Sequence, residues 1–165
     1  MPQNFRELPR PAAPPGQTAK RDADGDLGPV LRRNAARWYR RGMGVIHRRL
    51  GEAFRWDGVA LEDYAASGSA GTKQILIGAA EGAPNFALRY FEVAPGAGSA
   101  LDDHAHDHGV LILRGSGIVR LGDERHPIAT GDVVYIGPHE IHQFENPGPD
   151  PLGFLCIVGA ERARG

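Results

Sequence analysis

The chain has 165 residues, of which 41% are hydrophobic and 24% are charged, as is usual for a globular protein. Its formal net charge of −1 provides no overall attraction to nucleic acid or to an anionic membrane. No apolar run approaches the roughly 20 residues that a helix needs to cross a bilayer. The N-terminus lacks the apolar core of a secretory signal, and the single cysteine, Cys156, excludes an internal disulfide. We therefore expect a cytoplasmic protein with one main domain and with neither nucleic-acid nor membrane partners.

The first 55 residues differ in composition from the rest of the chain. Residues 1–29 contain six of the thirteen prolines and little apolar surface, which predicts a flexible tail. In residues 30–55, apolar side chains recur near helical spacing and arginines occupy the other faces, which predicts an arginine-rich helical segment, either two short helices or one helix broken near Gly42 and Gly44. We interpret these arginines as solvated side chains of a packed helix. The alternative is a basic surface for an anionic partner.

Residues 56–165 show the pattern of a β domain. Short apolar runs cover residues 73–78, 86–93, 110–113, 117–121, 132–136 and 152–158, and Gly–Asp, Gly–Pro and Asn–Pro–Gly turn sequences lie between many of them. Strands at such short intervals predict an all-β sandwich or barrel. Phe86, Leu88 and Tyr90 alternate along one strand, and we expect them to face the interior. Cys156 lies in a continuous apolar strand and is interpreted as an inert core thiol.

Six of the seven histidines lie between residues 104 and 142. Asp102, His104, His106 and His108 form a first cluster, and His142 closes a second one some thirty residues later. Imidazoles that separate strands carry to one interior point are a common way to bind a transition metal. The spacing therefore predicts a metal site. The competing interpretation is a surface histidine cluster that binds no metal.

These motifs resemble those of the cupin superfamily over residues 72–158, most closely the small single-domain bacterial cupins with a histidine-rich metal site. The second cupin motif has a glycine, a histidine eleven positions later and an asparagine four positions further, which Gly131, His142 and Asn146 match. The motif has a glycine where this chain has His139, a difference that concerns turn geometry. The resemblance implies a double-stranded β-helix, or jelly-roll barrel, over residues 56–165 with a short N-terminal helical extension.

The first cupin motif fits the chain in two registers that differ by two residues and so turn the same strand face inward. In the register that starts at Gly96, the ligand positions are Asp102, His104 and His108; in the one that starts at Gly98, they are His104, His106 and Val110. We favour the first register, because it combines with His142 into four donors. The expected ligands are therefore His104, His108 and His142, with Asp102 and His106 competing for the fourth place. The ion would be one divalent transition metal: Mn, Fe, Ni, Cu or Zn.

The resemblance implies three classes of function. The first is a dioxygenase-type oxidoreductase that acts on a small organic molecule. The second is a non-catalytic module that binds a metabolite or a metal, and the third is a metal-dependent isomerase or lyase. Tyr90, Tyr135 and Gln143 are candidates for contact with the small-molecule ligand. By resemblance alone we also expect a homodimer.

Overall fold

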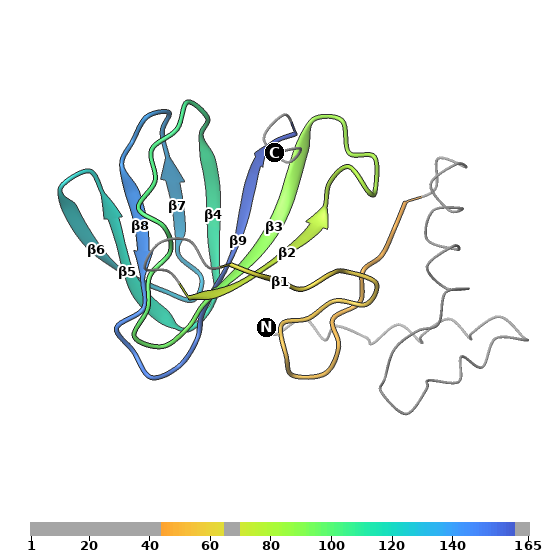
Figure 1. The fold of residues 1–165 in the computed structure, drawn as a ribbon, viewed down its shortest axis with the longest axis horizontal. Coiled ribbons are helices and arrows are strands. Elements are labelled where there is room, and N and C mark those ends of the chain that lie inside the picture. Colours follow the sequence, from red (N-terminus) through yellow and green to blue (C-terminus); the bar gives the residue numbers. More distant parts are fainter. Residues whose placement is uncertain (1–43, 65–69, 161–165) are drawn as a thin grey trace, which may run out of the picture.

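The structure is a computed structural model that describes residues 44–64 and 70–160. Within them, strands form a larger antiparallel sheet of order β1-β2-β3-β9-β4-β7 and a smaller one of order β6-β5-β8. Figure 1 shows the two sheets forming an open barrel. The strands are β1 (Glu62–Asp63), β2 (Gly71–Ile77), β3 (Phe86–Val93), β4 (His108–Arg114), β5 (Ser116–Leu121), β6 (Glu124–Ala129), β7 (Val133–Ile136), β8 (His142–Glu145) and β9 (Leu152–Gly159).

The chain changes sheets at tight turns. Only Gly115 separates β4 in the larger sheet from β5 in the smaller one. Its φ is +75°, and a Cβ at this position would meet the carbonyl oxygen of Pro151 at 2.5 Å. Glycine is therefore the residue that suits this crossing, both for its backbone conformation and for its lack of a side chain.

The hydrophobic core lies between the two sheets. Strands β3 to β9 contribute residues to it, mostly at alternate positions, as the predicted strand patterns require. The buried members of this core are Ala87, Val93, Val110, Ile112, Val119, Ile128, Val134, Ile136, Phe144, Leu152, Phe154, Cys156 and Val158. The all-β fold class expected from the sequence is confirmed.

The face of strand β3 that points inward is the opposite of the one that we expected. Phe91 and Val93 pack in the core, so the odd-numbered residues point inward. Tyr90 lies on the outer face, where its ring stacks on Phe54 with centroids 5.4 Å apart and meets Trp56 edge-on at 5.1 Å. Both faces of this strand are largely apolar, so alternation alone did not identify the inner one. Packing of a distant segment buries the outer face instead.

The described part of the arginine-rich segment, residues 44–55, contains no helix. It makes a turn at Gly51, where φ is +57°, and a β-bridge joins Arg49 to Trp56. The packing of Phe54 and Trp56 on the sheet outweighs the helical spacing of the apolar residues. Residues 30–43 and the tail expected over 1–29 lie outside the described residues. Over residues 44–64 and 70–160, no helix has the length and apolar character of a membrane span.

Candidate metal centre and its pocket

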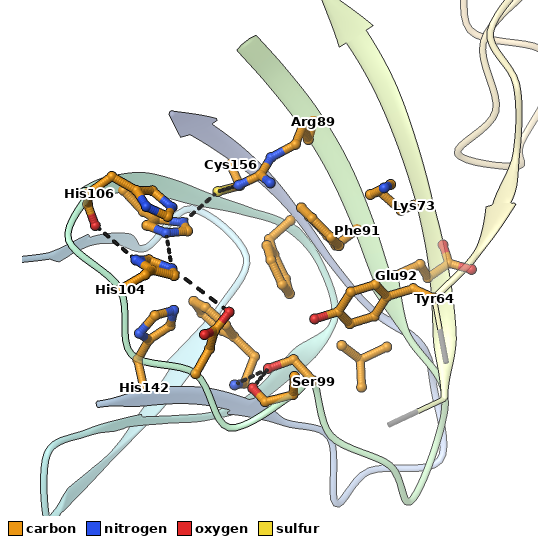
Figure 2. A pocket seen from close by; sticks show the side chains of 16 residues that line it. Tyr64, Lys73, Arg89, Phe91, Glu92, Ser99, His104, His106, His142 and Cys156 are labelled. Carbon is orange, nitrogen blue, oxygen red and sulfur yellow. Dashed lines mark hydrogen bonds and ion pairs between the residues drawn. The ribbon is translucent and has the colours of Figure 1, made fainter. Parts of the chain in front are cut away.

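Residues of both sheets line a pocket that contains the histidine cluster (Figure 2). The loop between β3 and β4 contributes Asp102, His104 and His106, and β4 contributes His108. His142 enters from the smaller sheet. Side chains of β3 and β9 form the wall beside the histidines. The two histidine clusters that lie far apart in the sequence therefore meet in one place.

The buried histidines occupy the first residues of strands. His108 opens β4 and His142 opens β8, with exposed fractions of 8% and 6%. His104 lies on the preceding loop, where its carbonyl oxygen accepts a hydrogen bond from the backbone N–H of His139 at 2.7 Å. His139 has a φ of 61°, the left-handed conformation that favours the glycine of the cupin motif. This turn keeps its geometry without glycine and holds the His104 loop in place.

The imidazoles converge on one point. The Nε2 atoms of His104 and His108 lie 2.7 Å apart. The ring centroid of His142 lies 4.9 Å from that of His104 and 5.2 Å from that of His108. The Oδ2 atom of Asp102 lies 3.9 Å from His104 Nε2, and two backbone hydrogen bonds of 2.9 and 3.0 Å join Asp102 to His142. The structure thus places Asp102, His104, His108 and His142 in one pocket, and their role as metal ligands stays a prediction.

Hydrogen bonds on the far side of two rings determine which nitrogen faces the pocket. Nδ1 of His104 donates to the carbonyl oxygen of His106 at 3.0 Å, and Nδ1 of His142 donates to that of Glu140 at 2.8 Å. Because a carbonyl only accepts, each neutral ring carries its proton on Nδ1 and presents a lone pair on Nε2. Metal-binding histidines are oriented in the same way. The donor set therefore fits a divalent transition metal.

His108 is held neutral by its surroundings. Burial is the main cause, and the neighbouring His104 and Arg89 add to it; together they lower the pKa of His108 to about 3. Its Nδ1 atom lies 3.1 Å from the sulfur of Cys156, and the same sulfur accepts a hydrogen bond from Arg89 Nη2 at 3.2 Å. Burial raises the pKa of the Cys156 thiol, although Arg89 opposes this shift. Cys156 is buried as expected, but it also lines the pocket and contacts a candidate ligand.

His106 is the competing fourth donor. Its ligating nitrogen and those of His104 and His108 all lie within 4.8 Å of one another. Two rings stack on that of His104: the His106 ring, with centroids 3.5 Å apart and planes at 18°, and the His108 ring, with centroids 4.4 Å apart and planes at 14°. Stacking therefore does not separate His106 from His108. We keep Asp102 as the expected fourth donor, because its backbone pairs with that of His142, and His106 as the alternative.

The three expected substrate contacts do not line this pocket. Tyr90 is buried on the outer face of β3, and Tyr135 is 65% exposed on β7. The side-chain amide of Gln143 donates to the carbonyl oxygen of Ser99 at 2.7 Å, which ties β8 to the loop that carries His104.

Sequence reasoning missed Arg89 and Phe91 as pocket residues. Both lie on the inner face of β3, in register with Cys156 and Phe154 of β9. A charged residue within an apolar strand was the one available signal. It did not show which face points inward, because that depends on packing between β3 and distant residues.

Comparison with known proteins identifies the family. The family model of the cupin domain matches residues 89–158. A 1-methylthio-D-xylulose 5-phosphate methylsulfurylase of Rhodospirillum rubrum is 44% identical over 113 residues, which are 66% of this chain and 71% of that protein. The chain belongs to the cupin superfamily. The structure of a cupin-2 domain from Rhodospirillum rubrum matches this cupin with 40% identity and a TM-score of 0.59, over 68% of this chain and 77% of the other.

A second solved structure agrees with the first. It is a cupin 2 conserved barrel domain protein from Rhodopseudomonas palustris, with 38% identity and a TM-score of 0.61, over 70% of this cupin and 81% of that chain. The double-stranded β-helix expected from the motifs is therefore confirmed.

Proposed function

We propose that this cupin is a metal-dependent enzyme that acts on a small sugar phosphate carrying a thioether. His104, His108 and His142 would hold one divalent transition metal (Mn, Fe, Ni, Cu or Zn), with Asp102 as the fourth donor. The observation that carries the proposal is the convergence of these imidazoles inside a pocket, with the lone pairs of His104 and His142 directed by hydrogen bonds to carbonyl groups. When bound, such an ion supplies Lewis acidity toward a carbonyl oxygen of the substrate.

The pocket surface beside the histidines is aromatic, which supports a thioether substrate. Phe91 and Phe154 stack with centroids 5.6 Å apart, and Phe154 and Phe144 stack at 4.3 Å. Contacts between a thioether sulfur and an aromatic ring are worth about 0.3–1.5 kcal/mol each. These rings would hold a methylsulfanyl group close to the metal donors and keep water away from it. The substrate class is that in the name of the Rhodospirillum rubrum relative.

A dioxygenase-type oxidoreductase is the second candidate. A site with three imidazoles and at most one carboxylate leaves coordination positions open for substrate and dioxygen. Asp102, which lies 3.9 Å from His104 Nε2, would then supply the carboxylate. The relative favours the thioether substrate, so we place oxidation second. A cytoplasmic homodimer remains a further prediction, and light scattering of the purified protein would test its dimeric part.

One experiment separates these classes. Protein loaded separately with each candidate metal is incubated with 1-methylthio-D-xylulose 5-phosphate, with and without a low-molecular-weight thiol as acceptor of the methylsulfanyl group. Mass spectrometry follows the substrate while an electrode records oxygen. Substrate loss without oxygen uptake, abolished in His104→Ala, is the expected result. Stoichiometric oxygen uptake would favour the dioxygenase, and binding without turnover would favour a non-catalytic module.

A further inference from the structure

We infer that the pocket contains an oxyanion subsite at Arg89, which binds a phosphate or carboxylate group of the substrate. This inference deepens the proposed function and rests on it for the identity of the molecule that carries the anion.

Arg89 points into the pocket from the inner face of β3, opposite Cys156 of β9. Figure 2 shows its guanidinium directed toward the histidine cluster. The centre of the guanidinium lies 5.1 Å from the centroid of the Phe91 ring. Its Nη2 atom donates to the Cys156 sulfur at 3.2 Å, and that sulfur lies 3.1 Å from Nδ1 of His108. Cys156 therefore contacts both the positively charged Arg89 and His108, a candidate metal ligand.

The guanidinium has no acidic partner among residues 44–64 and 70–160. Its Nε atom is buried and makes no hydrogen bond, and the acceptor of its Nη2 atom is a thiol sulfur. A thiol is a weak acceptor, whereas a guanidinium offers five donors in a planar fork that matches two oxygens of a carboxylate or phosphate. An oxyanion in the pocket would satisfy donors that the protein leaves unmatched, which favours its binding.

Other charged groups that line the pocket are already paired. Lys73 lies 2.9 Å from a carboxylate oxygen of Glu62, and Glu92 accepts from Arg114 at 3.0 Å. Asp102 lies across the pocket, beside the histidines. A divalent metal at the histidines would add two positive charges. The pocket then attracts an anion electrostatically, and Arg89 is the side chain placed to fix its orientation.

Anion binding tests this subsite without turnover. Chelator-treated protein, in which no metal competes for the anion, is titrated with inorganic phosphate and, separately, with acetate by calorimetry. The variants are Arg89→Met, which keeps an apolar stem over Phe91, and Arg89→Lys, which keeps the charge but loses the fork. The matched control is Arg120→Met, which removes an arginine that pairs with Asp123 away from the pocket. Circular dichroism and metal uptake show that each variant is folded.

We expect wild type and Arg120→Met to bind phosphate alike, Arg89→Met to bind it about 10- to 100-fold more weakly, and Arg89→Lys to lie between. The same pattern with acetate and not with phosphate would identify a carboxylate subsite. The inference is overturned if neither anion binds to the wild type at millimolar concentration, or if Arg89→Met binds as the wild type does. If Arg89→Met does not fold, equal binding by Arg89→Lys and wild type overturns it.

The outcomes also separate this inference from the proposed function. Phosphate binding that depends on Arg89, without any turnover of the thioether, would contradict the proposed reaction and support the oxyanion subsite. Turnover of the thioether, with anion binding that does not depend on Arg89, would support the proposed reaction and contradict the oxyanion subsite.

Discussion

The choice between Asp102 and His106 as fourth ligand provides the sharpest test of the metal centre. Asp102→Ala removes a carboxylate 3.9 Å from His104 Nε2, whereas the backbone hydrogen bonds that join residue 102 to His142 remain available. Binding of structural zinc is worth about 10–16 kcal/mol, so one of four donors contributes roughly 2.5–4 kcal/mol. At about 1.4 kcal/mol per tenfold change, we expect metal affinity to fall about 60- to 700-fold.

His106→Ala is the matched comparison. It removes a ring that stacks on His104 at 3.5 Å, and such stacking contributes about 0.5–1.5 kcal/mol. We therefore expect an affinity loss of about tenfold or less. His142→Ala is the positive control, since it removes a buried donor.

The assay is competition for zinc or manganese against a chromophoric chelator, with elemental analysis of the purified protein as a check on stoichiometry. A larger loss of affinity in His106→Ala than in Asp102→Ala would refute Asp102 as the fourth ligand and would favour the register that starts at Gly98. Stoichiometric metal in both His104→Ala and His142→Ala would place the ion elsewhere.

Three further predictions concern the scaffold. Gly153→Ala should lower the urea midpoint, because the new Cβ would overlap the hydroxyl of the buried Tyr90 and overpacking costs about 1–3 kcal/mol; an unchanged midpoint would contradict this. Burial, and then the charge of Glu92, raises the pKa of Tyr90 above its ordinary value of 10.0, so the unfolded chain loses this proton first as the pH rises. Stability should therefore be complete below pH 10 and decline above it; Tyr90→Phe should flatten that decline in urea titrations, whereas Tyr135→Phe should not. His139→Gly should raise the melting temperature, with a gain of about 0.5–1 kcal/mol, because a left-handed backbone costs other residues about 1–2 kcal/mol and glycine's greater chain entropy offsets part of the relief; a lower melting temperature would count against it.

Features that depend on residue type and short spacing could be predicted from the sequence. Alternating apolar runs and turn residues indicated the β domain, because side chains of a strand alternate between two faces whatever lies around it. The resemblance carried by Gly131, His142, Asn146 and the cluster at 102–108 implied the cupin fold, which is confirmed, and the candidate donors, which stay a prediction. These signals are residue types at fixed sequence spacing, so they need no knowledge of distant contacts.

Only the tertiary structure decided which face of β3 points inward and what surrounds the donors. Phe54 covers Tyr90 on the outer face, which leaves Arg89 inside and opposite Cys156. The same packing leaves residues 44–55 without a helix. The stacking of the His106 and His108 rings on that of His104 was likewise visible only in the structure. In each case the deciding contact joins residues of separate segments or depends on ring orientation, and neither pattern nor propensity within one segment contains that information.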